Sequence, residues 1–183
     1  MPDHGFVVER SRVVHTGPVV TTELLDIRTP DGAMIERQVC RHPGAVAVVA
    51  IHRGNVVLVR QYRAAIDDDL VEIPAGKRDV HDEPLEVTAR RELIEEVGLD
   101  PQSLVHLGTF VTAAGFCDEH IAIFGTDDCA EVERQVDGAE EAHSVVMPVP
   151  VGEIHDWLTS GRLTDAKSLI GLYWARDRGL LDA

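Results

Sequence analysis

Residues 76–99, with the sequence GKRDVHDEPLEVTARRELIEEVGL, decide the interpretation of this 183-residue chain. Within this segment Pro84 suits the first turn of a helix, and Gly98 suits the left-handed position just past its end. Apolar residues recur at every fourth position between them, as on the buried side of a helix: Leu85, Ala89, Leu93 and Val97. We therefore predict a helix over residues 84–97.

Three glutamates lie on the same predicted helix. Glu92, Glu95 and Glu96 occupy positions i, i+3 and i+4, so their carboxylates project from one side, offset from the apolar stripe. Like charges at this spacing destabilise a helix by about 0.2–0.5 kcal/mol per pair, and Arg90 and Arg91 offset only part of that cost. A run of charges is usually a solvated face, which is the alternative interpretation. Divalent cations would remove the repulsion, and Mg²⁺ suits one or two carboxylates plus substrate phosphates.

The whole segment resembles the Nudix box, the signature of the Nudix hydrolase family, usually written G-x5-E-x7-R-E-U-x-E-E-x-G-U with U an aliphatic residue. Every defining residue from Glu83 onward is present. The chain differs from the pattern at one point, because six residues, 77–82, separate Gly76 from Glu83 where the pattern has five. An alternative alignment makes Asp82 the acidic residue of this loop.

The resemblance implies an α+β fold, the α/β/α sandwich of the Nudix family, and a divalent metal, Mg²⁺ or its substitute Mn²⁺. Metal ions neutralise charge on phosphoryl oxygens and lower the pKa of a bound water. By position, Glu92 and Glu96 would be the principal metal ligands, with Glu95 close by and the backbone carbonyl of Ala75 as a further ligand. Arg91 would orient the glutamates by ion pairing.

A second acidic pair, Glu140 and Glu141, lies in an expected loop before a strand near residue 145. Read alone, this is an ordinary solvated loop. Similar proteins place a catalytic glutamate on the equivalent loop, and counting back from Trp157 favours Glu140. Glu140 is therefore a candidate general base, with Glu95 and Glu96 as alternatives.

Outside the box, the chain resembles the ADP-ribose pyrophosphatase branch of the family. The matching segments are residues 42–46 (HPGAV), 59–63 (VRQYR), 72–76 (EIPAG) and 114–119 (AGFCDE). Ala114 stands where this branch usually has a proline, which bears on the substrate and not on the reaction class. The resemblance implies these substrate-binding residues: Arg37, Arg63, Glu72, Phe116 and Glu119.

Arginine forks suit phosphate oxygens, which favours Arg63 at the substrate phosphates and Arg37 at the nucleotide. The alternative for each arginine is a surface ion pair. Phe116 could equally be a core residue.

Two parts of the chain are expected. Residues 1–42 form a small antiparallel β subdomain, which the resemblance implies is exchanged across a homodimer, and residues 43–183 form the Nudix domain. Alternating or apolar runs predict strands, and helical periods predict two helices after them. The strands are residues 45–51 and 55–61, joined by a tight turn, then 70–73, 105–111, 120–125 and 145–149; the helices are residues 152–160 and 165–177.

Composition excludes several classes of protein. A formal net charge of −15 argues against nucleic-acid binding, which needs clustered Lys and Arg. No apolar run approaches the roughly 20 residues of a membrane span. The start of the chain lacks the pattern of a secretory signal, and the three cysteines fit neither a disulfide framework nor a metal finger, so we expect a cytoplasmic protein.

The resemblance implies hydrolysis of ADP-ribose, a small-molecule nucleoside diphosphate derivative, to AMP and ribose 5-phosphate. The alternatives are a Nudix hydrolase acting on another nucleotide-sugar or on an oxidised nucleoside triphosphate, and a ligand-binding module that keeps the fold without the chemistry.

Overall fold

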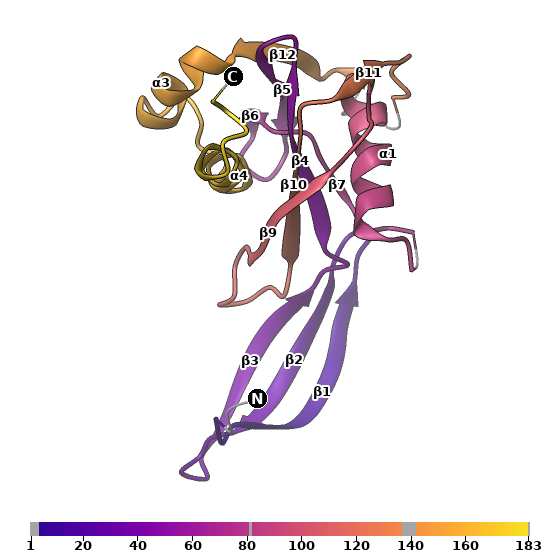
Figure 1. The fold of residues 1–183 in the computed structure, drawn as a ribbon. Coiled ribbons are helices and arrows are strands. Elements are labelled where there is room, and N and C mark those ends of the chain that lie inside the picture. Colours follow the sequence, from indigo (N-terminus) through magenta and orange to yellow (C-terminus); the bar gives the residue numbers. More distant parts are fainter. Residues whose placement is uncertain (1–3, 81, 137–141, 183) are drawn as a thin grey trace. The chain divides into compact units, whose positions relative to one another are not determined.

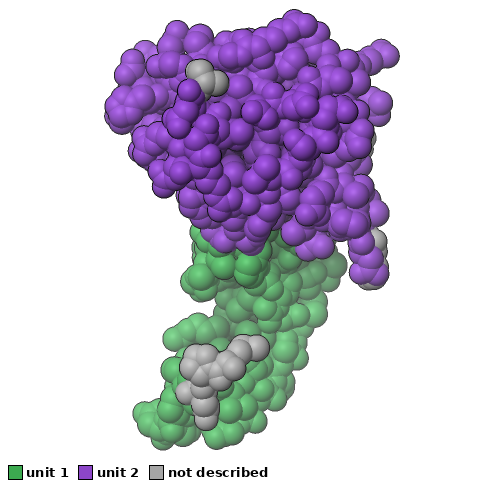
Figure 2. All heavy atoms as spheres, viewed as in Figure 1, with its two compact units in different colours: residues 1–44, 111–120 green, residues 45–110, 121–183 purple. Residues whose placement is uncertain are grey.

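A computed structural model describes residues 4–80, 82–136 and 142–182 (Figure 1). The chain divides into two compact units (Figure 2). Unit 1 comprises Met1–Gly44 and Val111–His120, and unit 2 comprises Ala45–Phe110 and Ile121–Ala183. The expectation that residues 1–42 form a subdomain exchanged in a dimer stays a prediction.

Unit 1 is built on a three-stranded antiparallel sheet, as the sequence predicted. Its strands, in the order β1-β2-β3, are β1 (Val7–Thr16), β2 (Thr21–Arg28) and β3 (Met34–Arg41). The turn between β2 and β3 places Gly32 at a φ of 88°, a conformation that favours glycine. Every residue of β1 is exposed, so this strand contributes nothing to the core of the chain.

Unit 2 contains a mixed seven-stranded sheet with a central order of β12-β5-β4-β10-β9. In addition, β6 pairs with β5, and β7 pairs with β4. β4 and β10 pair in parallel, whereas the pairs β12–β5, β4–β5, β5–β6 and β4–β7 are antiparallel. The strands are β4 (Ala45–His52), β5 (Asn55–Arg63), β6 (Asp68–Glu72), β7 (Ala75–Lys77), β9 (Val105–Val111), β10 (His120–Thr126) and β12 (Val145–Pro150).

Side chains of β4 alternate between two hydrophobic clusters. Val46 and Val48 pack with Ala89 and Leu93 of α1 (Leu85–Val97), whereas Val49 lies in the cluster on the opposite face. That second cluster includes residues of α3 (Ile154–Thr159) and α4 (Ala166–Asp177). The sheet is therefore covered by α1 on one side and by α3 and α4 on the other (Figure 1), which confirms the predicted α/β/α sandwich.

The predicted tight turn joins β4 to β5, with Arg53 at a φ of 50° and Gly54 at 75°. The two strands pair directly only next to this turn, at Ile51–Val56 and His52–Asn55. Beyond it they separate, and β6 and β7 pair with their facing edges. This separation places residues 72–76, which are the end of β6, the two-residue connection and the start of β7, in the middle of the sheet.

Most predicted elements agree with the structure to within a few residues. The predicted helix at 152–160 is a 3-10 turn (Val151–Glu153) followed by α3. Three short strands were not predicted, because a three-residue strand is too short to show a period: β7, β8 (Leu99–Pro101) and β11 (Cys129–Glu131). Among the described residues, no helix has the length and apolar character needed to cross a membrane.

Candidate functional site

The acidic helix α1 begins after Pro84 and ends at Gly98, which adopts a φ of 69°. A Cβ on Gly98 would lie 2.8 Å from the carbonyl oxygen of Val132, so both its conformation and its surroundings require glycine. Glu92 and Glu96 are 7% and 4% exposed, which is unusual for glutamates. They are therefore not part of a solvated face, and they extend the buried side of the helix beyond the apolar stripe.

Glu92 lies against the backbone of β7. A Cβ built on Gly76 would lie 1.8 Å from Cδ of Glu92 and 2.0 Å from its Oε2. The φ of Gly76 lies outside the left-handed region, so glycine is required here for space alone. The absence of a side chain at residue 76 is what lets the Glu92 carboxylate approach the strand.

Glu96 contacts the preceding residue of the same strand. The backbone N–H of Ala75 donates a hydrogen bond to Oε2 of Glu96 at 3.0 Å. Adjacent residues of β7 therefore receive the two buried carboxylates of α1, one through space left by a glycine and one through an amide. The Ala75 carbonyl stays a predicted metal ligand.

Arg91 is surrounded by carboxylates. Its Nη1 lies 2.9 Å from Glu92 Oε1 and 2.9 Å from Glu95 Oε2, while its Nη2 lies 3.3 Å from Asp79 and 3.5 Å from Glu83. Its Nε is buried and has no hydrogen-bond partner in the described part of the chain. One guanidinium thus draws the helix glutamates and the preceding loop together.

The loop before α1 distinguishes Glu83 from Asp82. Glu83 reaches Arg91 with a side chain that is 13% exposed. Asp82 is exposed and adopts a φ of 59°, which is uncommon for a residue other than glycine. Glu83 is therefore a member of the Arg91 cluster.

Burial changes the acid–base behaviour of Glu92. Removal from water raises the pKa of its carboxyl to about 7, Arg91 opposes the shift, and Glu95 adds to it. A carboxylate that is costly to ionise in isolation is stabilised by a bound cation. No group of three or more His, Cys, Asp or Glu side chains within the described ranges converges on one metal position. Two carboxylates nevertheless fit Mg²⁺, which keeps several waters and binds substrate phosphates in the same shell.

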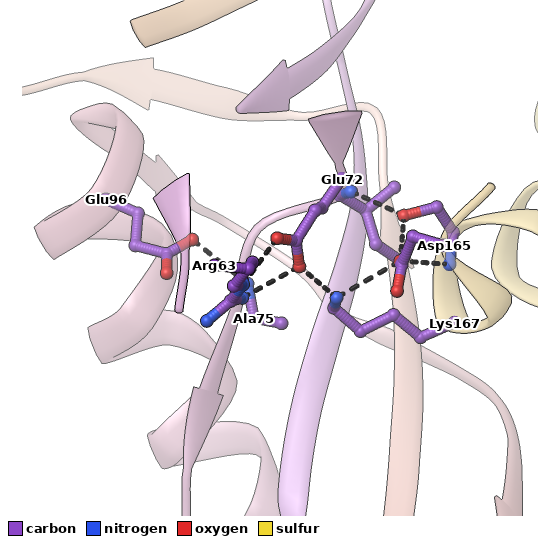
Figure 3. Close-up of polar contacts among 8 residues, drawn as sticks. Arg63, Glu72, Ala75, Glu96, Asp165 and Lys167 are labelled. Atoms are coloured by element: carbon purple, nitrogen blue, oxygen red, sulfur yellow. Dashed lines mark hydrogen bonds and ion pairs between the residues drawn. The ribbon is translucent and has the colours of Figure 1, made fainter. Parts of the chain in front are cut away.

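Arg63 lies at the end of β5 and forms a bidentate ion pair with Glu72 of β6 (Figure 3). Its Nε and Nη2 lie 2.6 and 2.7 Å from the two carboxylate oxygens. Lys167, in the first turn of α4, contacts the same carboxylate. The pKa of Arg63 is raised, first by the Glu72 hydrogen bond and to a smaller extent by the charges of Glu96 and Asp165, which places Arg63 in the field of the acidic helix.

Three predicted substrate-binding residues belong to unit 1. Arg37 is exposed and donates to the carbonyl of Glu36 at 2.8 Å. Phe116 is 60% exposed, so it is not a core residue of this chain. Glu119 accepts a hydrogen bond from Thr112 at 2.8 Å and lies 3.5 Å from His42. The remaining prediction, Glu140, falls outside the described residues.

A family model described as the NUDIX domain matches residues 41–169 of the chain, which is more than half of its length. The chain belongs to the Nudix family.

Two bacterial proteins, each named ADP-ribose pyrophosphatase, resemble this Nudix chain along most of their length. The protein of Bacillus subtilis (strain 168) is 32% identical over 171 residues, which cover 93% of this chain and 92% of that protein. The protein of Mycobacterium tuberculosis (strain ATCC 25618 / H37Rv) is 35% identical over 173 residues, 94% of this chain and 84% of that protein. A crystal structure of an ADP compounds hydrolase has the same fold, with a TM-score of 0.82, 21% identity, and coverage of 97% of this chain and 96% of that one.

The residues of α4 that support Glu72 were not predicted from the sequence. Asp165 caps the helix by accepting from the N–H of Ser168 at 2.9 Å, and it lies 3.1 Å from Lys167. Two signals were available in the sequence: Asp165 is a favourable N-cap residue, and Lys167 is one of two lysines in the chain. Neither signal indicates contact with residue 72.

Replacing Gly76 by Ala should displace the Glu92 carboxylate from the Nudix helix without straining the backbone. We expect Mn²⁺ affinity, measured by calorimetry, to fall on the order of 10–100-fold. Gly152→Ala is the matched control, because nothing lies within 4 Å of a Cβ at that position. A folded Gly76→Ala protein with unchanged Mn²⁺ affinity would contradict the expectation that Glu92 binds the metal while it lies against β7.

The pKa of Glu92 predicts a pH-dependent stability. The value is about 7 in the folded protein and 4.5 for an ordinary glutamate, so the folded state binds this proton more tightly. Without metal, ionised Glu92 opposes folding above about pH 7, and this cost disappears as the pH falls toward about 4.5. The stability gained by Glu92→Gln, measured by urea unfolding in EDTA, should therefore be larger at about pH 8 than at about pH 5. Glu86→Gln on the exposed side of α1 is the control, and equal gains at both pH values would refute the shift.

Proposed function

We propose that this Nudix chain hydrolyses the pyrophosphate bond of ADP-ribose to AMP and ribose 5-phosphate. The oxygen of a water molecule forms a bond to one phosphorus, and the bond from that phosphorus to the bridging oxygen breaks. The observation that supports the reaction class most directly is the burial of Glu92 and Glu96 against β7, since a bound divalent cation would stabilise two carboxylates held out of water. The two similar ADP-ribose pyrophosphatases support the choice of substrate.

The proposed cofactor is Mg²⁺, with Mn²⁺ as a substitute. Glu92 and Glu96 would hold it, with Glu95 nearby and the Ala75 carbonyl as a further ligand. When bound, the ion neutralises charge on the phosphoryl oxygens and lowers the pKa of a bound water. Arg91 keeps the glutamates oriented, because it bridges Glu92 and Glu95 at 2.9 Å each.

The remaining roles rest on resemblance and local geometry. Arg63 is proposed to bind substrate phosphate, and Arg37, Phe116 and Glu119 to contact the substrate. Glu140 is the proposed general base, with Glu95 and Glu96 as alternatives. Glu96 already accepts a hydrogen bond from Ala75, and Glu95 is paired with Arg91, which favours a base from elsewhere in the chain.

We further propose that the protein is a cytoplasmic homodimer in which the N-terminal strands are exchanged. Unit 1 exposes large apolar side chains on β1, including Val8 at 55% and Val13 at 58%. An exposed apolar strand is a site for association with another chain. The three cysteines are free, which agrees with a reducing compartment.

A substrate panel tests the proposed reaction. With Mg²⁺, we expect ADP-ribose to have the highest kcat/KM among ADP-ribose, other nucleotide-sugars and an oxidised nucleoside triphosphate, measured by chromatography of the nucleotide products. Glu96→Gln keeps an oxygen for Ala75 but loses the charge, and it should lower kcat by at least about 100-fold. Glu86→Gln should be nearly unchanged. If ADP-ribose ranked among the poorest substrates, the proposed specificity would be wrong; tight binding without turnover of any compound would indicate a ligand-binding module.

Light scattering during gel filtration tests the dimer. We expect a mass of about twice the 20.1 kDa of one chain. Replacing Val8 and Val13 by Asp should reduce the mass to that of a monomer, because charges on β1 oppose burial between copies. Val105→Asp is the control, since Val105 is equally exposed, at 56%, on β9 in unit 2. A monomeric unmodified protein would refute the homodimer.

A further inference from the structure

Lys167 is a nearly buried cation in an acidic chain. It lies in the first turn of α4, and its side chain is 11% exposed. It contacts Glu72 of β6 and lies 3.1 Å from Asp165, the residue that caps α4. A lysine is rarely buried unless it is paired, so the position of Lys167 is defined by these two carboxylates.

Glu72 is the centre of the arrangement, because two cations from different elements share its buried carboxylate. Oε1 faces Nε of Arg63, whereas Oε2 contacts both Nη2 of Arg63 and Nζ of Lys167 (Figure 3). Burial alone would raise the pKa of Glu72, but Arg63 and Lys167 lower it below the ordinary value. The carboxylate is therefore ionised at neutral pH and held from both sides.

One edge of the Arg63 guanidinium faces the Glu72 carboxylate, and the rest of the guanidinium does not. Nε and Nη2 form the pair, so Nη1 lies outside it, and the side chain is 37% exposed. In the sheet, Arg63 is opposite Asp68 and not Glu72. The ion pair thus crosses the β5–β6 ladder diagonally, and the carboxylate, rather than the strand pairing, sets the plane of the guanidinium.

We propose that Lys167 is a positioning residue for Arg63 and acts through Glu72. By holding Oε2 from the side of α4, Lys167 prevents Glu72 from turning and keeps Arg63 aligned to receive a phosphate of the substrate. The inference rests on the proposed function, in which Arg63 binds phosphate. It assigns to α4 a part in substrate binding that the Nudix box does not contain.

A purely structural role for Lys167 is the competing explanation. The docking of α4 has other support, however, since Oγ of Ser168 accepts a hydrogen bond from the N–H of Ile73 at 2.8 Å and Asp165 caps the helix. Leu172 and Ala175 of the same helix are completely buried. The helix can therefore stay in place when the Lys167 charge is removed, and the effect on Arg63 can be measured separately.

The test measures binding of ADP-ribose, and of inorganic pyrophosphate as a second probe, by calorimetry in EDTA so that no turnover occurs. We expect Lys167→Met to weaken binding about ten-fold, as for the loss of a charged hydrogen-bond partner, and Lys167→Arg to recover most of it. On an Arg63→Met background, Lys167→Met should change binding by less than about two-fold. With Mg²⁺, Lys167→Met should raise KM more than it lowers kcat.

Arg176→Met is the control, because Arg176 is an exposed cation on the same helix. Its guanidinium carbon lies 4.8 Å from the centre of the Tyr173 ring. Unchanged affinity in folded Lys167→Met, or losses that multiply on the Arg63→Met background, would overturn the proposal. If Lys167→Met does not fold, the double variant Glu72→Gln with Lys167→Met is used, because it removes both buried charges. Affinity of this double variant equal to that of the unmodified protein would overturn the proposal.

The two probes separate this inference from the choice of substrate. Binding of pyrophosphate without binding of ADP-ribose would refute the proposed substrate, and the coupling of Lys167 to Arg63 would then be measured with pyrophosphate. Binding of neither probe would refute the phosphate role of Arg63, and with it the positioning role of Lys167.

Discussion

The burial of Glu92 and Glu96 on α1 depends on the backbone of β7. One carboxylate accepts a hydrogen bond from a backbone N–H of this strand, and the other occupies space that a side chain at residue 76 would fill. A carboxylate that leaves water loses solvation that must be replaced by hydrogen bonds or opposite charge. Ala75 supplies an amide to Glu96, Gly76 supplies room for Glu92, and Arg91 supplies part of the charge. The geometry of the acidic site depends on this close approach of α1 to the backbone of β7.

Much of the fold was predictable because it depends on short-range patterns. The apolar spacing on α1, Pro84 before it and Gly98 after it define the helix almost to the residue. The hairpin of β4 and β5 is marked by its turn, and the apolar run of β4 from Ala45 to Ile51 indicates a strand covered on both faces. The burial of Glu92 and Glu96 was not predictable in the same way, because hydropathy treats every glutamate as a solvated residue.

The arrangement around Glu72 was not predictable from the sequence either. Lys167 and Glu72 are 95 residues apart in the chain, and their contact depends on how α4 packs across the sheet. Resemblance to a family identified Arg63 and Glu72 separately, but it did not show that Arg63 and Lys167 share the Glu72 carboxylate. Neither propensity nor spacing reports such a contact, since it is created by tertiary packing.

The separation of β4 and β5 has a consequence for how the length of this chain can vary. Glu72 and Ile73 meet Lys167 and Ser168 of one helix, and only two residues later Ala75 and Gly76 meet the other helix. A single insertion or deletion within residues 72–76 would shift the register of the residues that follow it, so the N–H of Ala75 and the glycine at residue 76 would no longer face Glu96 and Glu92. The adjoining loop already holds one residue more than the family pattern and still delivers Glu83 to Arg91. Insertions and deletions among homologous chains should therefore collect after residue 77 and be absent from the five residues that join the two helices through the sheet.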